Sequence, residues 1–215
     1  MSKGISKDVS KDLRGPSSWT DHYCSWKHLY TPVFFIIHMY TELSILRLFF
    51  DDPTENFYIR EIARKSALSH MTVRKYLSLF VQAGLLVQHK SKPYSTFTAN
   101  SSDQKYLHLK LFYNLERLQE SKIVSDLEHF FDYPVIVLFG SYAQASNTKE
   151  SDIDIFILTN IKKEFPTTKY EKTLHRKINL WVCNETEFAR VKAKSPELVN
   201  NLCNGITLSG KLEVL

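Results

Sequence analysis

Two short apolar runs, each joined to a small polar motif, constrain this chain more than any other part of its sequence. Residues 135–139 read Val-Ile-Val-Leu-Phe and end at a glycine-serine pair, while residues 153–158 are mostly apolar and overlap an Asp-Ile-Asp motif at 152–154. Runs of this length that are rich in β-branched residues and stop at glycine are typical of buried strands. We therefore expect two core strands, one ending at a turn and the other beginning at paired carboxylates.

The chemistry of these motifs favours a nucleotide. Gly140 permits close backbone approach, and Ser141 follows it in a segment that can begin a helix whose free N–H groups attract phosphate. Asp152 and Asp154 are two residues apart, so in a strand their carboxylates point to the same face. Two such carboxylates repel each other unless a cation lies between them, and Mg²⁺ bound by carboxylates and substrate phosphates meets that need. The motifs predict metal-assisted phosphoryl or nucleotidyl transfer.

The Gly-Ser-Tyr-Ala motif at 140–143 and the Ser-Asp-Ile-Asp-Ile-Phe-Ile motif at 151–157 resemble a known active site. It is the site of the DNA polymerase β-like nucleotidyltransferase superfamily, and the closest branch is that of the small prokaryotic minimal nucleotidyltransferases. The resemblance implies transfer of a nucleoside monophosphate from a triphosphate, with ATP expected, to a hydroxyl of a protein or small molecule, using Mg²⁺ or Mn²⁺. The site residues that it implies are nucleotide-binding Gly140 and Ser141 and catalytic, metal-binding Asp152 and Asp154.

This chain departs from the family pattern at two places. Many relatives have an Arg-Gly pair after the Gly-Ser-x-Ala motif, where this chain has Gln144 and Ala145. The family also places a third carboxylate on a later strand, where the expected position is Asn179, and Glu185 and Glu187 follow that strand. Asparagine can coordinate metal through its carbonyl oxygen, but it adds no negative charge and is no general base. The alternative is therefore a site that binds nucleotide and metal without efficient turnover.

The net positive charge is concentrated in the N-terminal part of the chain. Residues 1–100 carry 13 Lys and Arg against 8 Asp and Glu, whereas residues 101–215 carry 15 of each kind. Within residues 58–100 the seven basic residues face a single acid, Glu61. Such a concentration of positive charge favours a polyanionic partner.

The order of expected elements in this basic segment is helix, helix, turn, helix and hairpin. The helices are expected at residues 42–50, 58–66 and 70–83, with Thr41 capping the first and Ser69 the third. The hairpin strands are expected at residues 85–90 and 95–99. Asp51-Asp52-Pro53 should end the first helix and Gly84 the third.

This order resembles the winged helix-turn-helix DNA-binding family. The resemblance implies that the third helix enters the major groove and that the hairpin contacts the DNA backbone or minor groove. The alternative is a solvated helix face on a module that docks protein. The residues that would contact DNA are Ser69, His70, Thr72, Arg74 and Lys75 on the third helix, and Lys90 and Lys92 on the hairpin.

These patterns together predict an α+β protein in which a helical linker joins a winged helix-turn-helix domain to a small mixed-sheet nucleotidyltransferase domain. The leucine-rich stretch at 106–131 should form one kinked helix or two short ones. A native start at Met39 is left open, in which case the preceding segment is an upstream extension of the reading frame. The expected boundaries are 1–38 for an N-terminal extension, 39–100 for the DNA-binding domain, 101–132 for the linker and 133–215 for the nucleotidyltransferase domain.

The expected function is that of a nucleotidyltransferase with a DNA-binding domain. The alternative is a transcriptional regulator, or the antitoxin of a toxin-antitoxin pair, whose nucleotidyltransferase domain is weakly active or inactive. DNA is the expected partner, a toxin of the HEPN ribonuclease class is the partner that the resemblance implies for the antitoxin alternative, and a homodimer is left open. Three scattered cysteines and the lack of an apolar run near twenty residues favour a cytoplasmic protein outside the membrane.

Overall fold

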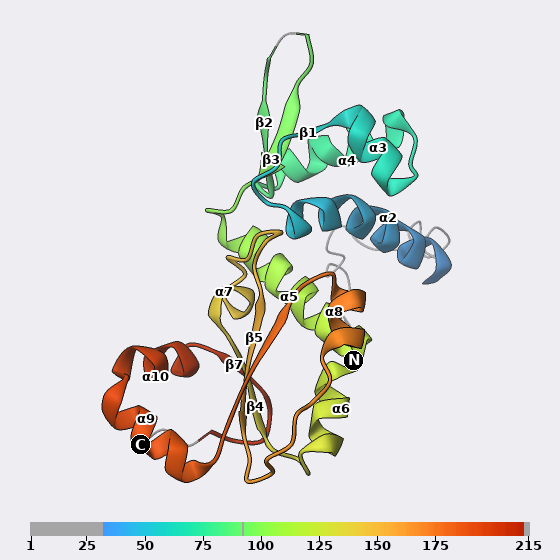
Figure 1. Cartoon of the computed structure of the whole chain (residues 1–215). Coiled ribbons are helices and arrows are strands. Elements are labelled where there is room, and N and C mark those ends of the chain that lie inside the picture. Colours follow the sequence, from blue (N-terminus) through green and yellow to red (C-terminus); the bar gives the residue numbers. More distant parts are fainter. Residues whose placement is uncertain (1–31, 92, 213–215) are drawn as a thin grey trace, which may run out of the picture. The chain divides into compact units, whose positions relative to one another are not determined.

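The computed structural model describes residues 32–91 and 93–212, with side chains from residue 41 onward. Residues Leu43–Leu215 belong to one compact unit, which begins within helix α2 (Pro32–Asp51). The N-terminal extension that we predicted at 1–38 therefore lies mostly outside the described residues. The compact unit holds the elements from the end of helix α2 to strand β7 (Figure 1).

Helix α2 (Pro32–Asp51) begins well before Glu42, where the sequence pattern placed its start. Proline is suited to a first helical position because its missing N–H needs no partner there. The prediction that Thr41 caps this helix is wrong, since Thr41 lies inside it. The helix ends at Asp51 as expected, two residues before Pro53. Among the described residues, none of the helices combines the length and the apolar character that a membrane crossing requires.

The elements predicted between residues 58 and 99 are confirmed, with small changes at their ends. They are α3 (Ile59–Ser66), α4 (His70–Gln82), β2 (Leu86–His89) and β3 (Thr96–Ala99). A strand that the sequence did not reveal, β1 (Phe57–Tyr58), pairs with β3, so the strand order is β1-β3-β2. The assignment of this segment to the winged helix-turn-helix family stays a prediction.

Helix α4 begins and packs as its sequence pattern indicates. The Ser69 hydroxyl accepts a hydrogen bond from the Thr72 N–H at 3.1 Å, which is the predicted N-cap. Val73, Leu77 and Phe80 recur at three and four residues and are all buried in the first hydrophobic core. The charged side chains between them are therefore left on the outer face of the helix.

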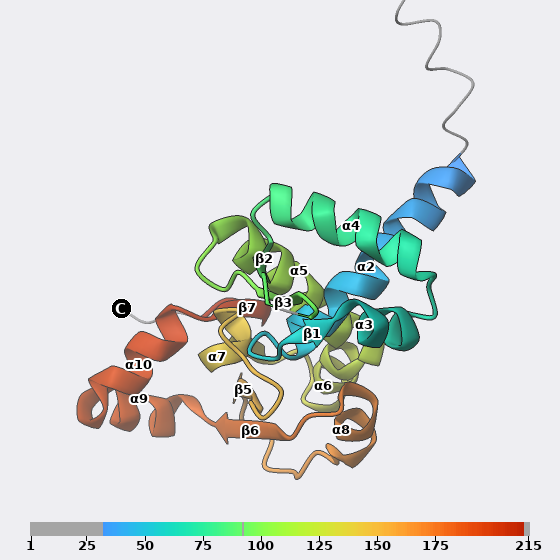
Figure 2. The same cartoon turned by 90° about the horizontal axis from the view of Figure 1, so that it is seen from above.

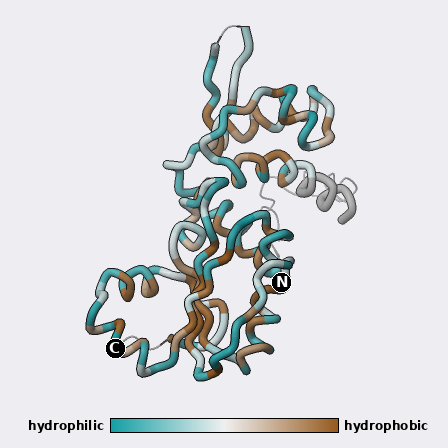
Figure 3. The backbone as a smooth tube through the Cα atoms, in the orientation of Figure 1, coloured by the Kyte–Doolittle hydropathy of each residue, from teal (hydrophilic) through white to brown (hydrophobic). Residues whose placement is uncertain are grey.

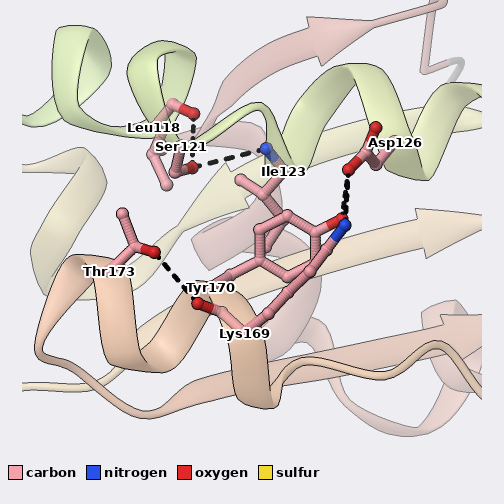
Figure 4. A network of polar contacts seen from close by, with 7 residues as sticks. All are labelled: Leu118, Ser121, Ile123, Asp126, Lys169, Tyr170 and Thr173. Atoms are coloured by element: carbon pink, nitrogen blue, oxygen red, sulfur yellow. Dashed lines mark hydrogen bonds and ion pairs between the residues drawn. The ribbon is translucent and has the colours of Figure 1, made fainter.

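The leucine-rich stretch forms two helices, α5 (Gln104–Ser121) and α6 (Ile123–Phe130). Lys122, which separates them, has a φ of 62°, in the left-handed region that interrupts a right-handed helix. The Ser121 hydroxyl donates to the Leu118 carbonyl at 2.7 Å and accepts the first N–H of α6 at 3.3 Å (Figure 4). The two-helix form of the prediction is thus the observed one.

Helix α6 is connected to α8 (Thr168–Leu174) through one carboxylate. Asp126 accepts hydrogen bonds from the Tyr170 hydroxyl and, at 3.0 Å, from Lys169 Nζ (Figure 4). These two bonds, with that of Tyr170 the larger influence, hold the pKa of Asp126 below its usual range. The side chains of α8 thereby fix the helix against the linker.

The second sheet is mixed, with the strand order β6-β5-β4-β7. Strand β5 pairs antiparallel with β4 and parallel with β6, while β4 also pairs antiparallel with β7. The sequence pattern predicted the first three strands and missed β7. The strands are β4 (Val135–Phe139), β5 (Ile153–Leu158), β6 (Ile178–Cys183) and β7 (Ile206–Ser209).

Helices cover both faces of this sheet (Figures 1 and 2). Alternating residues of the strands point to opposite faces. Ile136 and Ile155 therefore pack with α5, α6 and α8, whereas Phe156 packs with α9 (Glu185–Lys194) and α10 (Pro196–Cys203). Figure 3 shows the resulting hydrophobic centre in brown along the strands. Burial on both faces makes the strands a rigid base for the loops at their ends.

The turn between α3 and α4 contains a residue in an uncommon backbone conformation. Ala67 has a φ of 55° and donates its N–H to the Ala63 carbonyl, as in a left-handed helix C-cap. Its side chain is exposed, so the methyl group contributes little packing to offset the strain. Glycine is the residue that adopts this conformation without cost.

We expect Ala67→Gly to raise the free energy of unfolding by about 0.5–1 kcal/mol, because it removes the left-handed strain. Ala83→Gly is the matched control, since Ala83 is also an exposed C-cap but has a φ of -73°. Glycine there relieves no strain and should lower the free energy of unfolding by up to about 1 kcal/mol. Urea unfolding followed by circular dichroism measures both, and loss of stability in Ala67→Gly would contradict the turn described here.

Candidate active site

Strand β4 runs directly into the glycine-serine turn. Gly140 has a φ of 72° and begins the short helix α7 (Gly140–Ala143), the helix expected after the strand. A Cβ atom built on Gly140 would lie 2.7 Å from Asp154 Oδ2, closer than any real side chain permits. The positive φ favours glycine here, a side chain would displace the Asp154 carboxylate, and the backbone of the turn lies against one of the two predicted carboxylates.

Asn179 joins the two aspartates. Strands β5 and β6 pair in a register that places Asn179 beside Asp154. The Asn179 Nδ2 atom donates to Asp152 Oδ2 at 3.2 Å and to Asp154 Oδ1 at 3.0 Å. Both carboxylates thus face one point, as the strand alternation predicts. The amide occupies the strand position at which the resemblance led us to expect a third acid, and it offsets part of the repulsion between the aspartates without adding charge.

The other acids considered for a third position lie in helix α9. Glu187 accepts a hydrogen bond from the Asn184 N–H at 3.0 Å and lies 3.6 Å from Lys162 Nζ, so it caps the helix. Glu185 is exposed in the same first turn. Within the part of the chain that the structure describes, no group of three or more His, Cys, Asp and Glu side chains is placed to hold a metal ion. The acidic set is therefore Asp152 and Asp154.

This pair of carboxylates fits the ligand set that Mg²⁺ uses beside a nucleotide. Mg²⁺ commonly takes one or two protein carboxylates and completes its shell with water and substrate phosphates. Gly140 carries no Cβ, and a Cβ there would come within 2.7 Å of Asp154 Oδ2, so the glycine lets the turn approach that carboxylate closely. Turning the Asn179 amide over would present its carbonyl oxygen to the same point, as a neutral third ligand.

The loop after α7 contains a left-handed turn at a position where the resemblance led us to expect glycine. Ala145 has a φ of 55° and is 3% exposed. A non-glycine residue in this conformation costs on the order of 1 kcal/mol, so the surrounding structure must hold it in place. The Ser146 N–H donates to the Ser141 carbonyl at 3.0 Å and closes the turn. Gln144 is exposed and provides no cation beside Ser141.

Sequence reasoning missed two polar side chains of α5 that hold this loop. Lys110 and Asn114 are each 1% exposed. Lys110 Nζ donates to the Asn147 carbonyl, and Asn114 Nδ2 donates to the Tyr142 carbonyl and to Asn147 Oδ1, both at 2.9 Å. Burial, and then the nearby charge of Arg176, lower the pKa of Lys110 to about 8. Their four-residue spacing on an otherwise apolar helix face is the signal that could have revealed them.

The residues predicted to contact DNA have different surroundings. Ser69 and Thr72 bond to each other through their hydroxyl oxygens at 2.8 Å, and Ser69 caps α4. Both hydroxyls are therefore engaged within the helix start. The basic residues and His70 are exposed on α4 and just after β2, with Lys75 Nζ 6.0 Å from the centre of the Tyr76 ring, whereas Lys92 lies outside the described residues. The exposed members of the predicted set are Ser69, His70, Arg74, Lys75 and Lys90, and Thr72 is partly buried.

A groove of about 1280 Å³ lies between α3, α4 and the hairpin. Arg60, Arg64 and Arg74 all line it, together with exposed aromatic side chains. The Arg60 guanidinium carbon lies 5.6 Å from the centre of the Tyr94 ring. This cation–π contact connects α3 to the hairpin. The charge count of the sequence included Arg60 and Arg64, but only the tertiary structure places them beside the outer face of α4.

A known family model matches the part of the chain that contains the second sheet. Residues 121–211 match the family model described as polymerase beta, nucleotidyltransferase. No curated protein matches the chain. The matched residues include Gly140, both aspartates and Asn179, while the basic groove lies outside them. Nucleotidyltransferase domains generally use a nucleoside triphosphate and a divalent metal, and the match supports the nucleotidyltransferase superfamily for residues 121–211.

Proposed function

We propose that residues 133–215 transfer a nucleoside monophosphate from a nucleoside triphosphate to a hydroxyl of a protein or small molecule. ATP is the expected donor, and Mg²⁺ or Mn²⁺ is the expected metal. One observation carries this proposal: the carboxylates of Asp152 and Asp154 face a common point beside the side-chain-free backbone of Gly140. Paired carboxylates next to a glycine turn suit a substrate that brings both phosphates and a metal ion.

Each residue of the site has a role in this proposal. The backbone of Gly140 and Ser141 lies against the triphosphate, because no side chain at Gly140 keeps it away. Asp152 and Asp154 would hold the divalent cation, which when bound would neutralise charge on the triphosphate and polarise the reacting phosphorus. Asn179 holds the two carboxylates in their orientation through its amide N–H groups.

We expect Asp152→Ala and Asp154→Ala each to reduce label transfer from ATP in the presence of Mg²⁺ by about a thousandfold. Loss of a metal ligand removes several kcal/mol of transition-state stabilisation, and each 1.4 kcal/mol is about tenfold in rate. The measurement is transfer of label from α-labelled ATP to protein and to small acceptors in lysate. Glu164→Ala removes an exposed carboxylate elsewhere and should retain activity. Transfer that survives both aspartate substitutions would rule out this site.

Asn179 favours a second candidate function. An amide in place of the third acid leaves a site suited to binding nucleotide but poorly equipped to activate a hydroxyl. The protein would then act as a DNA-binding regulator, or as the antitoxin of a HEPN-type toxin, with a weakly active or inactive nucleotidyltransferase domain. A neighbouring reading frame for a small helical HEPN protein, and co-purification of its product with this chain, would favour the antitoxin.

The substitution Asn179→Asp separates these two candidates. A third carboxylate should lower the Mg²⁺ concentration for half-maximal nucleotide binding by about tenfold, because ligand charge sets divalent affinity. Label transfer should rise together with the Mg²⁺ affinity, if the missing acid limits turnover. Asn160→Asp adds the same charge at an exposed position beyond the other end of β5 and should change neither quantity. A fall in both metal affinity and label transfer in Asn179→Asp would mean that the site requires the amide of Asn179 itself.

We further propose that residues 39–100 bind DNA through the outer face of α4 and the hairpin. The support is the cluster of exposed basic side chains on α4 and the basic groove beside it. Lys65 is less suited to a contact, because its ammonium lies 2.9 Å from the Glu61 carboxylate. Arg60 and Arg64 join the predicted contacts, since both line the groove with Arg74.

We expect the double substitution Arg74→Ala and Lys75→Ala to weaken binding to DNA of all sequences. Each lost phosphate contact should reduce the slope of log affinity against log salt by about one. Fluorescence anisotropy with duplex DNA over a range of salt concentrations measures both effects. Lys105→Ala with Lys172→Ala removes two exposed positive charges from helices outside the groove and serves as the control. Equal effects of the two double variants would show that α4 is no specific contact.

A further inference from the structure

One guanidinium holds the segment that leads into Asp152. Arg176 lies between α8 and β6, and its Nη1 atom donates to three backbone carbonyls of the loop before β5. These are the carbonyls of Thr148, of Lys149 at 3.0 Å and of Ser151 at 3.2 Å. A planar guanidinium can hold several acceptors in a fixed geometry. Three carbonyls of the loop directly before Asp152 therefore accept hydrogen bonds from a single side chain.

The same guanidinium reaches two other parts of the structure. Its Nη2 atom donates to the Asp51 carbonyl at 3.2 Å, at the C-terminal end of α2, where the helix dipole favours a cation. Its central carbon lies 5.9 Å from the centre of the Tyr142 ring, in the residue after Ser141. No ion pair within residues 41–91 and 93–212 includes Arg176, so its charge is directed at these carbonyl dipoles.

The two aspartates differ in how much they depend on this loop. Asp154 lies within β5 and pairs with Phe139 and Asn179 in the two neighbouring strands. Asp152 precedes the first residue of β5, so no strand pairing fixes its backbone. Its position follows from the loop on one side and from the start of the strand on the other.

We propose that Arg176 is a positioning residue that sets the place of the Asp152 carboxylate relative to Asp154 and Gly140. By holding the carbonyls at 148, 149 and 151, it fixes the backbone from which Asp152 projects. This inference rests on the proposed metal and nucleotide site. Arg176 itself acts through the loop and touches neither carboxylate.

Other contacts keep the loop folded when Arg176 is changed. Lys110 and Asn114 bind Asn147 at the start of the loop, and the Thr148 N–H donates to Ser151 Oγ at 2.9 Å. Loss of the guanidinium should therefore loosen the residues next to Asp152 without unfolding the domain. The expected effect is local and falls on metal affinity.

The test uses the full chain with Arg176→Gln and follows binding of a fluorescent, non-hydrolysable ATP analogue at increasing Mg²⁺. We expect the Mg²⁺ concentration for half-maximal binding to rise about tenfold, as is common when residues that orient metal ligands are lost. Binding without metal should stay unchanged, because Gly140 and Ser141 are not held by Arg176. Arg176→Lys should recover part of the affinity, since an ammonium can still donate to one or two of the carbonyls. Hydrogen exchange of the amides at 148–152 should be faster in Arg176→Gln.

Arg117→Gln is the matched control. Arg117 Nη2 also donates to a backbone carbonyl, that of Thr173 at 3.1 Å, but this carbonyl lies in α8 and not in the loop. It should keep the wild-type Mg²⁺ dependence, and an equal shift in both variants would overturn the proposal.

The remaining outcomes distinguish this proposal from the proposed function. Unchanged Mg²⁺ dependence in folded Arg176→Gln overturns the positioning role while the site stands. A wild-type chain that binds no analogue at any Mg²⁺ concentration overturns the proposed function, and with it the role that we assign to Arg176. If Arg176→Gln fails to fold, Arg176→Lys decides: an intermediate rise in the Mg²⁺ requirement supports the proposal, and wild-type dependence overturns it.

Discussion

The register of β5 between its two neighbours is the constraint on which the candidate site depends. Antiparallel pairing with β4 places Asp154 beside Phe139, the residue before the glycine turn, and parallel pairing with β6 places it beside Asn179. A shift of one residue would turn Asp154 to the opposite face and bury it among apolar side chains. The buried isoleucines at 153, 155 and 157 oppose such a shift, because they would leave the hydrophobic core. The packing of the core therefore fixes the register of β5, and that register fixes the geometry of the site.

Around this rigid sheet edge, the loop between α7 and β5 is held by groups from outside it. Ala145 adopts a left-handed conformation that glycine would adopt without strain, and the buried polar side chains of α5 support the chain on either side of it. Arg176 holds the end of the loop. The helix α5, which we interpreted as a linker, is thus also part of the support of the candidate site. Substitutions at Lys110 or Asn114 should act on nucleotide binding as well as on stability.

Asn179 gives the site its particular electrostatic character. Its amide donates to both carboxylates, so the pair is oriented even though only two acids are present. The arrangement suits a cation that arrives with a substrate rather than one held by protein ligands alone. The basic groove has the opposite charge and lies in a different sheet and helix set. The two surfaces therefore suit different ligands, a metal-nucleotide at the first and a polyanion at the second.

Local pattern alone was sufficient for the strands at 135–139, 153–158 and 178–183, for the ends of α4 and for the face shared by the two aspartates. These features depend on alternation, caps and glycine, which act over a few residues. Strands β1 and β7 were not predicted, because short strands are defined by their pairing partners rather than by their own composition. The early start of α2 was not predicted either. The amide bridge of Asn179 could be suspected from its place on a strand, but its contacts with Asp152 and Asp154 required the register. Lys110, Asn114 and Arg176 act on carbonyls far along the chain, so only the tertiary structure could assign them to the candidate site.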